Sequence, residues 1–438
     1  MAMRRLAVLL GLFTVLGTAC TSGGGGQTST AGCTGKVSGG PVTVKLWFHS
    51  GTGAERDVVA SQVSAFNASR SDVKVQLVLL PEGQYNDQVK AAAAGGQLPD
   101  ILDFDGPFLY NYAWSRNLIP MDSCISSDLK ADLLPSIVAQ GTYAKHLYGV
   151  GSIDSGLGLY TRKSLLTKNG IRIPSGPQDA WSADEFSKIL KTLQGAGFKK
   201  PLDLKLNYGA TEWYTYGFSP IIQSAGGDLI NRSNYQSADG VLNSSASVQA
   251  LTVFQSWFKA GYVDPNDDDA AFKTGRSAIS WVGHWMFVDY KKVYGDDLVI
   301  LPLPNFGTGS KTGMGSWQWG ITSNAKSVDA AWAFVNYLLQ DKQIIQYTNA
   351  NGAVPATKSA IAQSPQFAQG SPEYIYVVQL QSIAVPRPQT PAYPTITQAF
   401  TKAIDDIVHG GDVKTALDNA VRTIDKDIKS NDGYPIKG

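Results

Sequence analysis

Residues 42–80 read VTVKLWFHSGTGAERDVVASQVSAFNASRSDVKVQLVLL, and this stretch decides the fold class. Apolar side chains alternate from Val42 to Phe48, which predicts a strand, and a second alternating run covers Val73 to Leu79. Between the two runs, apolar residues recur at the spacing of one helix face. A strand, helix and strand of this length favour two parallel strands joined by a right-handed crossover, so the sequence predicts an α/β sheet.

Helical and strand patterns continue to alternate after this unit. A helix is predicted over Tyr85–Ala94, where Gly95-Gly96 ends it, and residues 98–107 contain another short strand and a turn. In open parallel sheets, ligands bind beyond the carboxyl ends of the strands. The loops His49–Glu55 and Asp103–Asp105 are therefore predicted to face a ligand.

The chain that follows the first 40 residues is too long for one hydrophobic core. It contains about 400 residues, so at least two domains are expected. Ser182 with Glu185 is predicted to open one helix as a capping box, and a helix from Asp329 is predicted to return to the first domain. The predicted bounds are residues 41–153 with 315–350 for the first α/β lobe, and residues 154–314 with 351–438 for the second.

The first twenty residues have the pattern of an export signal peptide. Arg4 and Arg5 precede a short apolar run, Leu6–Leu16, which falls short of the roughly 20 residues of a membrane-spanning helix. The segment Leu16-Gly17-Thr18-Ala19-Cys20 resembles a bacterial lipobox, with Gly17 in place of the usual leucine. The resemblance implies lipidation of Cys20, whereas ordinary signal cleavage nearby would release a soluble protein.

Residues 21–40 are predicted to form a flexible tether. Residues 21–30 contain no apolar side chain whose burial could offset the entropy of ordering. About 20 such residues have a reach of roughly 25 Å. A lipid-anchored protein with this tether would hold its folded body at the extracytoplasmic face of the bacterial cell membrane, close to a membrane partner.

The composition argues against a nucleic-acid partner. The formal net charge is +1, so no excess of Lys and Arg is present to neutralise phosphates. Only 17% of residues are charged, while the chain contains 10 Trp and 19 Tyr. This profile suits a neutral, polar ligand held by stacking and hydrogen bonds, although packing in a large protein accounts for most of these aromatic residues.

Cys33 and Cys124 are the two remaining thiols if Cys20 carries lipid. In an oxidising compartment such a pair most often forms a disulfide, which we predict here. Neither cysteine lies in a CxxC motif, and the four His residues show no metal-ligand spacing. No metal and no cofactor are predicted.

Several segments, in a shared order along the chain, resemble the extracellular solute-binding proteins of ABC importers, in particular sugar receptors of the maltose and trehalose type. The resemblance spans almost the whole chain after the tether. The segments that carry it are the first strand with Trp47, Gly95–Ile101, Leu118–Asp122, Leu159–Leu166, Gly275–Trp285 and Asn351–Pro355. In Leu159–Leu166, Thr161-Arg162 replaces part of the Tyr-Asn-Lys segment that the family usually shows.

The resemblance implies a periplasmic-binding-protein clamshell, in which two α/β lobes enclose a ligand cleft. It implies that a sugar or short oligosaccharide binds between the lobes, and that closure presents the protein, as a monomer, to the permease subunits of an ABC importer. It implies a receptor and not an enzyme, so no catalytic residue is expected.

Candidate ligand-binding residues follow from matching to the family's cleft. Trp285 and Trp317 are predicted as stacking platforms, because aromatic rings bury the C–H faces of sugars. Trp317-Gln318-Trp319 alternates, and we expect its two indoles to face opposite sides of a strand. Carboxylates and Arg hydrogen-bond sugar hydroxyls with charge assistance. The remaining candidates are Glu55, Asp105 and Asp154 as acceptors, Arg387 as donor, and Trp213, Trp281 and Trp319 as secondary aromatic residues.

Four alternatives stay open. Arg387 lies between Pro386 and Pro388, which also suits a rigid surface kink. The same receptor fold could bind a glycerophosphodiester or another polar solute. A secreted glycosidase would need two suitably spaced carboxyl groups, which a sequence cannot measure. A surface adhesin would not need tryptophans at cleft positions.

Overall fold

The unit predicted over residues 42–80 is present. The strands β1 (Val42–His49) and β2 (Val73–Leu80) pair in parallel along their whole length, and the helix α1 (Gly53–Ser69) connects them. Thr52 and Glu55 cap α1 reciprocally: the Thr52 side chain accepts from the Glu55 N–H, and the Glu55 carboxylate accepts from the Thr52 N–H. The α/β class predicted from this stretch is confirmed.

The computed structural model describes residues 33–37 and 40–436. The predicted signal peptide (1–20), its Cys20 and residues 21–32, 38 and 39 of the predicted tether lie outside the described residues. Of the helices in the described part of the chain, none combines the length and apolar character needed to cross a bilayer.

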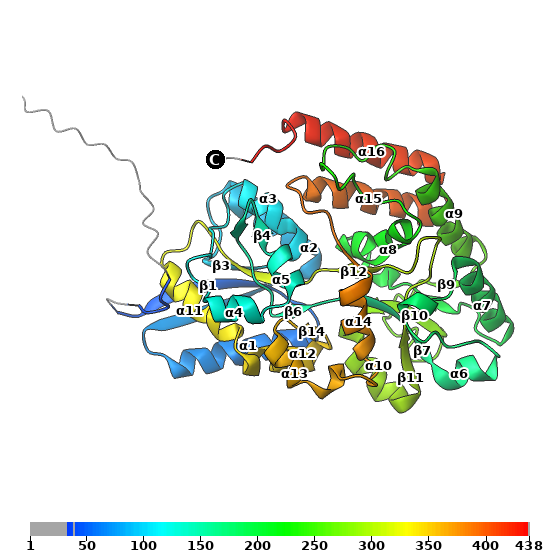
Figure 1. Cartoon of the computed structure of the whole chain (residues 1–438), viewed down its shortest axis with the longest axis horizontal. Coiled ribbons are helices and arrows are strands. Elements are labelled where there is room, and N and C mark those ends of the chain that lie inside the picture. The colour runs from blue at the N-terminus through cyan, green and yellow to red at the C-terminus, as the bar shows by residue number, and fades with distance from the viewer. Residues whose placement is uncertain (1–32, 38–39, 437–438) are drawn as a thin grey trace, which may run out of the picture. The chain divides into compact units, whose positions relative to one another are not determined.

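Two sheets form the folded body (Figure 1). The first has the order β13-β3-β1-β2, in which β3 (Ile101–Asp105) runs parallel to β1 and β13 (Trp317–Ile321) runs antiparallel to β3. The second has the order β11-β7-β10-β8-β9, and β10 pairs antiparallel with β7 and parallel with β8. Its strands are β7 (Leu157–Arg162), β8 (Leu202–Asp203), β9 (Val263–Asp264), β10 (Ile279–Gly283) and β11 (Leu298–Leu301). We call the parts built on these sheets the first and the second lobe.

Helices cover both sheets (Figure 1). Those of residues 82–140 are α2 (Glu82–Ala94), α3 (Leu109–Trp114), α4 (Ser127–Asp132) and α5 (Pro135–Gln140). Those of residues 163–294 are α6 (Lys163–Lys168), α7 (Ala183–Gly195), α8 (Glu212–Ser224), α9 (Ser245–Lys259) and α10 (Phe287–Tyr294). The later ones are α11 (Val328–Leu338), α12 (Asp341–Asn351), α13 (Lys358–Ala362), α14 (Tyr374–Ser382), α15 (Tyr393–Val408) and α16 (Val413–Ser430).

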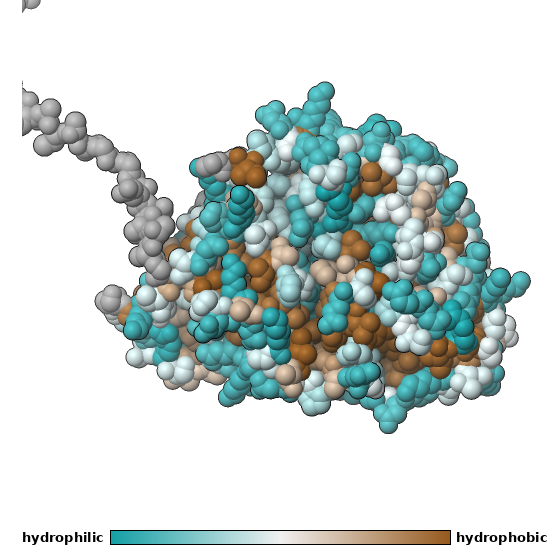
Figure 2. All heavy atoms as spheres, in the orientation of Figure 1, coloured by the Kyte–Doolittle hydropathy of each residue, from teal (hydrophilic) through white to brown (hydrophobic). Residues whose placement is uncertain are grey.

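Each lobe has its own core of buried side chains. In the first, Phe334 of α11 meets Phe66 of α1 edge-on, with ring centroids 5.0 Å apart, so the helix predicted from Asp329 packs beside α1. In the second, Phe186 of α7 meets Trp257 of α9 with ring centroids 5.1 Å apart. Hydrophilic side chains are spread over the face in Figure 2, while hydrophobic ones gather mainly along its middle.

The predicted capping box of α7 forms only in part. The Ser182 side chain accepts from the Glu185 N–H, as expected at a helix start. The Glu185 carboxylate pairs with Arg172 at 2.7 Å, and this bond, with a smaller contribution from the Ser182 N–H, lowers the pKa of the Glu185 carboxyl group. The predicted helix start is therefore confirmed, and the reciprocal contact of the box is weaker than the one at α1.

Short strand pairs lie where the chain passes between the lobes. β6 (Ile153–Asp154) pairs antiparallel with β14 (Val354–Pro355), and β12 (Thr312–Met314) pairs parallel with β15 (Ala384–Pro386). Figure 1 shows β6, β14 and β12 between the two sheets. A last pair joins β4 (Thr142–Tyr143) to β5 (His146–Leu147). The lobe boundaries at residues 153/154, 314/315 and 350/351 stay a prediction.

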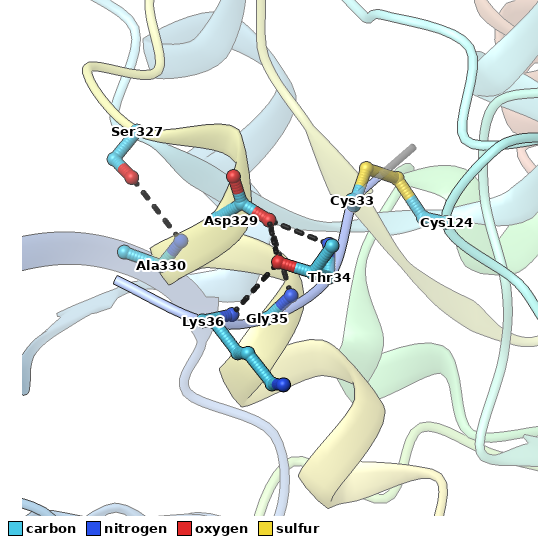
Figure 3. Close-up of a disulfide and its surroundings, with 8 residues drawn as sticks. All are labelled: Cys33, Thr34, Gly35, Lys36, Cys124, Ser327, Asp329 and Ala330. Atoms are coloured by element: carbon cyan, nitrogen blue, oxygen red, sulfur yellow. Dashed lines mark hydrogen bonds between the residues drawn. A yellow bond between two sulfur atoms is a disulfide. The ribbon is translucent and has the colours of Figure 1, made fainter. Parts of the chain in front are cut away.

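In the structure, the sulfur atoms of Cys33 and Cys124 are joined (Figure 3). The neighbouring backbone is also held, because the N–H groups of Thr34 and Gly35 donate to Asp329 Oδ1 at 2.6 and 3.1 Å. We predict that this bond is present in the exported protein. Peptide mapping without reductant should recover the two cysteines in one linked fragment. Two free thiols in protein from its native compartment would contradict the prediction.

Candidate ligand-binding site

A cavity of about 1890 Å³ lies between the two lobes. From the first lobe it is lined by the ends of β1, β3 and β13, and from the second lobe by η4 (His284–Met286) and the start of α8. This volume exceeds the roughly 300–1,000 Å³ of a pocket for a drug-sized ligand. The predicted candidates that line it are Glu55, Asp105, Trp213, Trp285, Trp317 and Arg387.

Arg387 joins the two lobes at this cavity. It follows β15, and its two Nη atoms donate to the two carboxylate oxygens of Asp105, each at 2.5 Å. Nη1 also donates to Glu212 Oε1 at 2.6 Å, and the guanidinium lies 4.8 Å from the ring centroid of Tyr216. Arg387 is only 5% exposed, so the alternative of a surface kink is wrong. Its planar guanidinium suits this two-oxygen contact, in which Asp105 ends β3 of the first lobe and Glu212 begins α8 of the second.

Glu212 is held by more than the arginine. Burial raises the pKa of the Glu212 carboxyl group, and the positive charge of Arg387 opposes that rise. Thr397 donates to its Oε2 at 2.6 Å, and the Tyr393 hydroxyl donates to its Oε1. The carboxylate is therefore oriented by three donors from α15 and the segment before it.

Trp285 stands at the second-lobe side of the cavity. Its Nε1 donates to the Tyr208 hydroxyl at 3.1 Å, which fixes the plane of the indole. Trp213 meets it edge-on, with ring centroids 5.9 Å apart. Trp213 is itself held by a bond from its Nε1 to the Leu204 carbonyl oxygen at 3.0 Å. These contacts preorganise Trp285, while the half-buried side chain remains open to the cavity.

Trp317 stands at the first-lobe side. It is the first residue of β13, opposite Asp105 of β3, and its indole lies parallel to the His49 ring with centroids 3.5 Å apart. Tyr85 of α2 meets the same indole edge-on at 5.4 Å. A tryptophan from each lobe thus reaches one cavity.

Trp319 lies in the core of the first lobe. The predicted reason, that Trp317 and Trp319 face opposite sides of the strand, is wrong. Residues two apart in a regular strand point to the same face, so alternation alone does not separate residues 317 and 319. Trp317 differs from Trp319 because it is the first residue of the strand, and its ring stacks on His49. Trp319 lies farther inside, stacked on Phe48 at 5.9 Å, with its Nε1 bonded to Ser152 at 2.8 Å.

Two further candidates also lie outside the cavity. Trp281 of β10 is fully buried, and its Nε1 donates to the Gly217 carbonyl oxygen at 3.0 Å. Asp154 of β6 is fully buried where the chain passes between lobes, and its Oδ1 accepts from the Ser155 N–H at 2.8 Å. We leave Trp319, Trp281 and Asp154 out of the proposed site, because core packing accounts for all three.

His49 begins the loop that was predicted to face a ligand, but it was not itself named as a binding residue. It is 2% exposed, lines the cavity and pairs through Nδ1 with Asp103 Oδ2. Burial lowers the pKa of His49, but the charge and hydrogen bond of Asp103 outweigh that effect and raise it to about 9. The other histidine of the cavity, His284, donates through Nδ1 to the Asn351 carbonyl oxygen at 2.9 Å, and burial lowers its pKa. These shifts favour the protonated form of His49 and the neutral form of His284 at neutral pH.

Other lining residues were missed for a simpler reason. Glu212, Tyr208 and Tyr216 are ordinary polar and aromatic residues around Trp213, and only their position beside that candidate could have marked them. Across residues 33–37 and 40–436, no three His, Cys, Asp or Glu side chains gather in a way that suits a metal ion.

The sequence profile of the bacterial extracellular solute-binding proteins matches residues 61–372. The chain belongs to this family. The resemblance found in the sequence is thereby confirmed, and so is the expectation of a receptor, since members of the family bind solutes and are not enzymes.

Three relatives illustrate the range of this solute-binding protein family. An uncharacterized lipoprotein of Streptomyces antibioticus is 22% identical over 76% of this chain and 74% of its own length. The maltotriose-binding protein of Pyrococcus abyssi is 23% identical over 83% of this chain and 77% of its own. The GacH receptor of Streptomyces glaucescens, solved unliganded and with acarbose, covers 89% of this chain and 97% of its own, with a TM-score of 0.75 and 23% identity. The last comparison confirms the predicted two-lobe fold.

Proposed function

We propose that this solute-binding protein captures a sugar or short oligosaccharide between its lobes and delivers it to the permease of an ABC importer. A lipid on Cys20 would hold it, as a monomer, at the extracytoplasmic face of the membrane. The observation that carries the proposal is that Trp317 of one lobe and Trp285 of the other line a single cavity together with Asp105 and Arg387.

This arrangement matches the two kinds of surface on a sugar. The C–H faces of a pyranose ring pack on aromatic rings, and its hydroxyl groups need donors and acceptors of fixed direction. The half-buried indoles of Trp285 and Trp317 offer the first, and the Asp105 carboxylate with the Arg387 guanidinium offers the second.

Charge favours a neutral ligand over the phosphodiester alternative. Among the charged side chains at the cavity, Glu55, Asp105, His49 and Arg387 are buried, Asp103 is buried behind His49, and Glu212 is partly buried. Four of these are carboxylates and two are cations, and each cation is already paired with a carboxylate. A phosphate group placed here would meet an excess of negative charge, whereas a neutral hydroxyl would not.

Size favours an oligosaccharide. The cavity runs from the two tryptophans to the outer ends of α3 and α16, where Trp114 and Tyr434 line it. The rings of Trp114 and Tyr434 lie 5.0 Å apart, so aromatic side chains also stand at the far end. A chain of several sugar units would use more of this length than one unit. The maltotriose-binding relative supports this choice.

A thermal-shift screen tests the proposal. The panel contains mono-, di- and trisaccharides, including maltotriose, and glycerophosphodiesters as the matched anionic set. We expect a di- or trisaccharide to raise the melting temperature, because a ligand at a hundredfold excess over its Kd adds about 2.7 kcal/mol of stability. A shift with phosphodiesters alone, or with no carbohydrate of the panel, would contradict the proposal.

A further inference from the structure

The turn after β1 leaves a small space at the cavity wall. Gly51 has a φ of +49°, in the left-handed region that favours glycine. A Cβ atom at this position would lie 2.6 Å from Glu55 Oε2 and 3.2 Å from His49 Nε2. His49, Gly51 and Glu55 all line the cavity. A side chain at this position would crowd both atoms, so glycine keeps open the cavity in front of the turn, and this space is bordered by one ring nitrogen and one carboxylate oxygen.

The His49 ring is fixed so that Nε2 borders this space. Its Nδ1 pairs with Asp103 Oδ2, and its backbone N–H donates to the same oxygen at 3.3 Å. The indole of Trp317 lies against the ring with an interplanar angle of 2°. Within the described part of the chain, no hydrogen bond engages Nε2. Because Asp103 accepts the proton on Nδ1, the proton that His49 can offer to a ligand is the one on Nε2.

The Glu55 carboxylate is equally fixed. Oε2 accepts from the Thr52 N–H at 2.8 Å, and Oε1 accepts from Asn351 Nδ2 at 3.1 Å. A carboxylate oxygen has two lone pairs, so Oε2 can accept one more hydrogen. The side chain is 7% exposed and lies at the first turn of α1. It thus provides an acceptor of set direction beside the donor of His49.

We propose that His49 Nε2 and Glu55 Oε2, separated by the turn at Gly51, form a subsite for one hydroxyl group of the carbohydrate. This inference rests on the proposed function. A hydroxyl group is both acceptor and donor, so its oxygen takes the His49 proton while its hydrogen is donated to Glu55. An O-methyl group lacks that hydrogen, and a phosphate would be repelled by Glu55.

The subsite should respond to pH in the alkaline range. The charged groups that face His49 are Asp103 from β3, Glu55 from α1 and Glu82 from α2, and together with the hydrogen bond from Asp103 they hold its pKa near 9 despite burial. Loss of a proton then removes the Nε2 hydrogen, because Nδ1–H stays bound to Asp103. Affinity should therefore be constant below this pH and fall as the pH rises through 9.

The test uses the carbohydrate that gives the largest shift in the panel, titrated by calorimetry at pH 7 and pH 10. Gly51→Ala should raise its Kd by about tenfold or more, as expected for a lost hydrogen bond to a charged group. Gly96→Ala is the matched control: its φ is +64°, so the backbone cost is similar, but a Cβ there meets nothing within 4 Å. Its Kd should equal that of the wild type.

The titrations at two pH values show whether His49 contacts the ligand or only supports the structure. The wild-type Kd should rise by about tenfold between pH 7 and pH 10, and the rise should be absent in His49→Gln, which does not titrate. Equal affinities of Gly51→Ala and Gly96→Ala, or a wild-type affinity that is flat through pH 9, would overturn the subsite while leaving the proposed function intact. A wild type that binds no carbohydrate of the panel would refute the proposed function, and the subsite with it.

Discussion

Replacing Trp285 by alanine should weaken carbohydrate binding by roughly ten- to hundredfold, because burying an aromatic face is worth on the order of 1.5–3 kcal/mol. The same loss is expected for Trp317→Ala, since the two indoles reach the cavity from opposite lobes. Calorimetric titration with the best carbohydrate of the panel measures the effect. Both side chains are half-buried, so the melting temperature of the ligand-free protein should change little.

Trp281→Ala is the matched control for this prediction. Trp281 lies four residues before Trp285 but is fully buried in the second-lobe core. Its loss should cost about 3–5 kcal/mol of unfolding free energy with little change in Kd, the reverse of the expected pattern at Trp285. If Trp285→Ala and Trp317→Ala both bind the carbohydrate as the wild type does, our placement of the platforms is wrong.

Replacing Arg387 by methionine should destabilise the protein by about 3–5 kcal/mol, because the buried Asp105 and the partly buried Glu212 would be left without their cation. The unneutralised charge of the two carboxylates, more than the lost volume of the arginine side chain, causes the loss of stability. The triple variant Arg387→Met, Asp105→Asn, Glu212→Gln should therefore recover most of it. Urea unfolding followed by circular dichroism at pH 7 measures all three proteins.

Arg276→Met provides the comparison for that experiment. Arg276 also bridges two carboxylates, those of Asp264 and Asp268, but its side chain is 42% exposed. Arg276 and Asp268 are exposed to solvent, although Asp264 is only 6% exposed, so water screens much of this network and its removal should shift the urea midpoint less than Arg387→Met does. Equal losses for the two arginine variants would mean that burial of Arg387 is not what makes its ion pairs matter.

Local sequence patterns predicted the strands and helices well. The contacts of the binding site were harder to predict, because they join residues that are far apart in the chain. Alternation fixed β1 and β2, and the spacing of apolar residues fixed α1, because each depends on neighbours within a few positions. The pairing of Asp105 with Arg387 joins residues 282 positions apart in the chain, and no local pattern connects them. The resemblance to the family predicted both residues as ligand contacts, but the ion pair between them is visible only in the structure.

The second limit on predicting the site was that the sequence does not show which of two similar side chains is buried. Trp281 and Trp285 have the same chemistry and lie on one strand and the turn that follows it, yet only Trp285 reaches the cavity. The end of β10 at Gly283 decides this, and strand ends are the least certain part of a sequence-based prediction. His49 was not singled out within its predicted loop for the same reason: one position along β1 separates His49, which lines the cavity, from Phe48, which does not.

The place of β13 in the first sheet has a consequence for how the protein folds. Asp105 of β3 lies opposite Trp317 of β13, so the sheet gains its fourth strand only when a segment from far along the chain arrives. Contacts of such long range slow folding, and the first lobe should remain incomplete until most of the second lobe has been synthesised. A protein containing only residues 41–153 would expose β3 as an unpaired edge that invites aggregation. To obtain the first lobe alone, residues 315–350 would have to be joined directly to residue 153, so that β13 is synthesised soon after β3, its partner in the sheet.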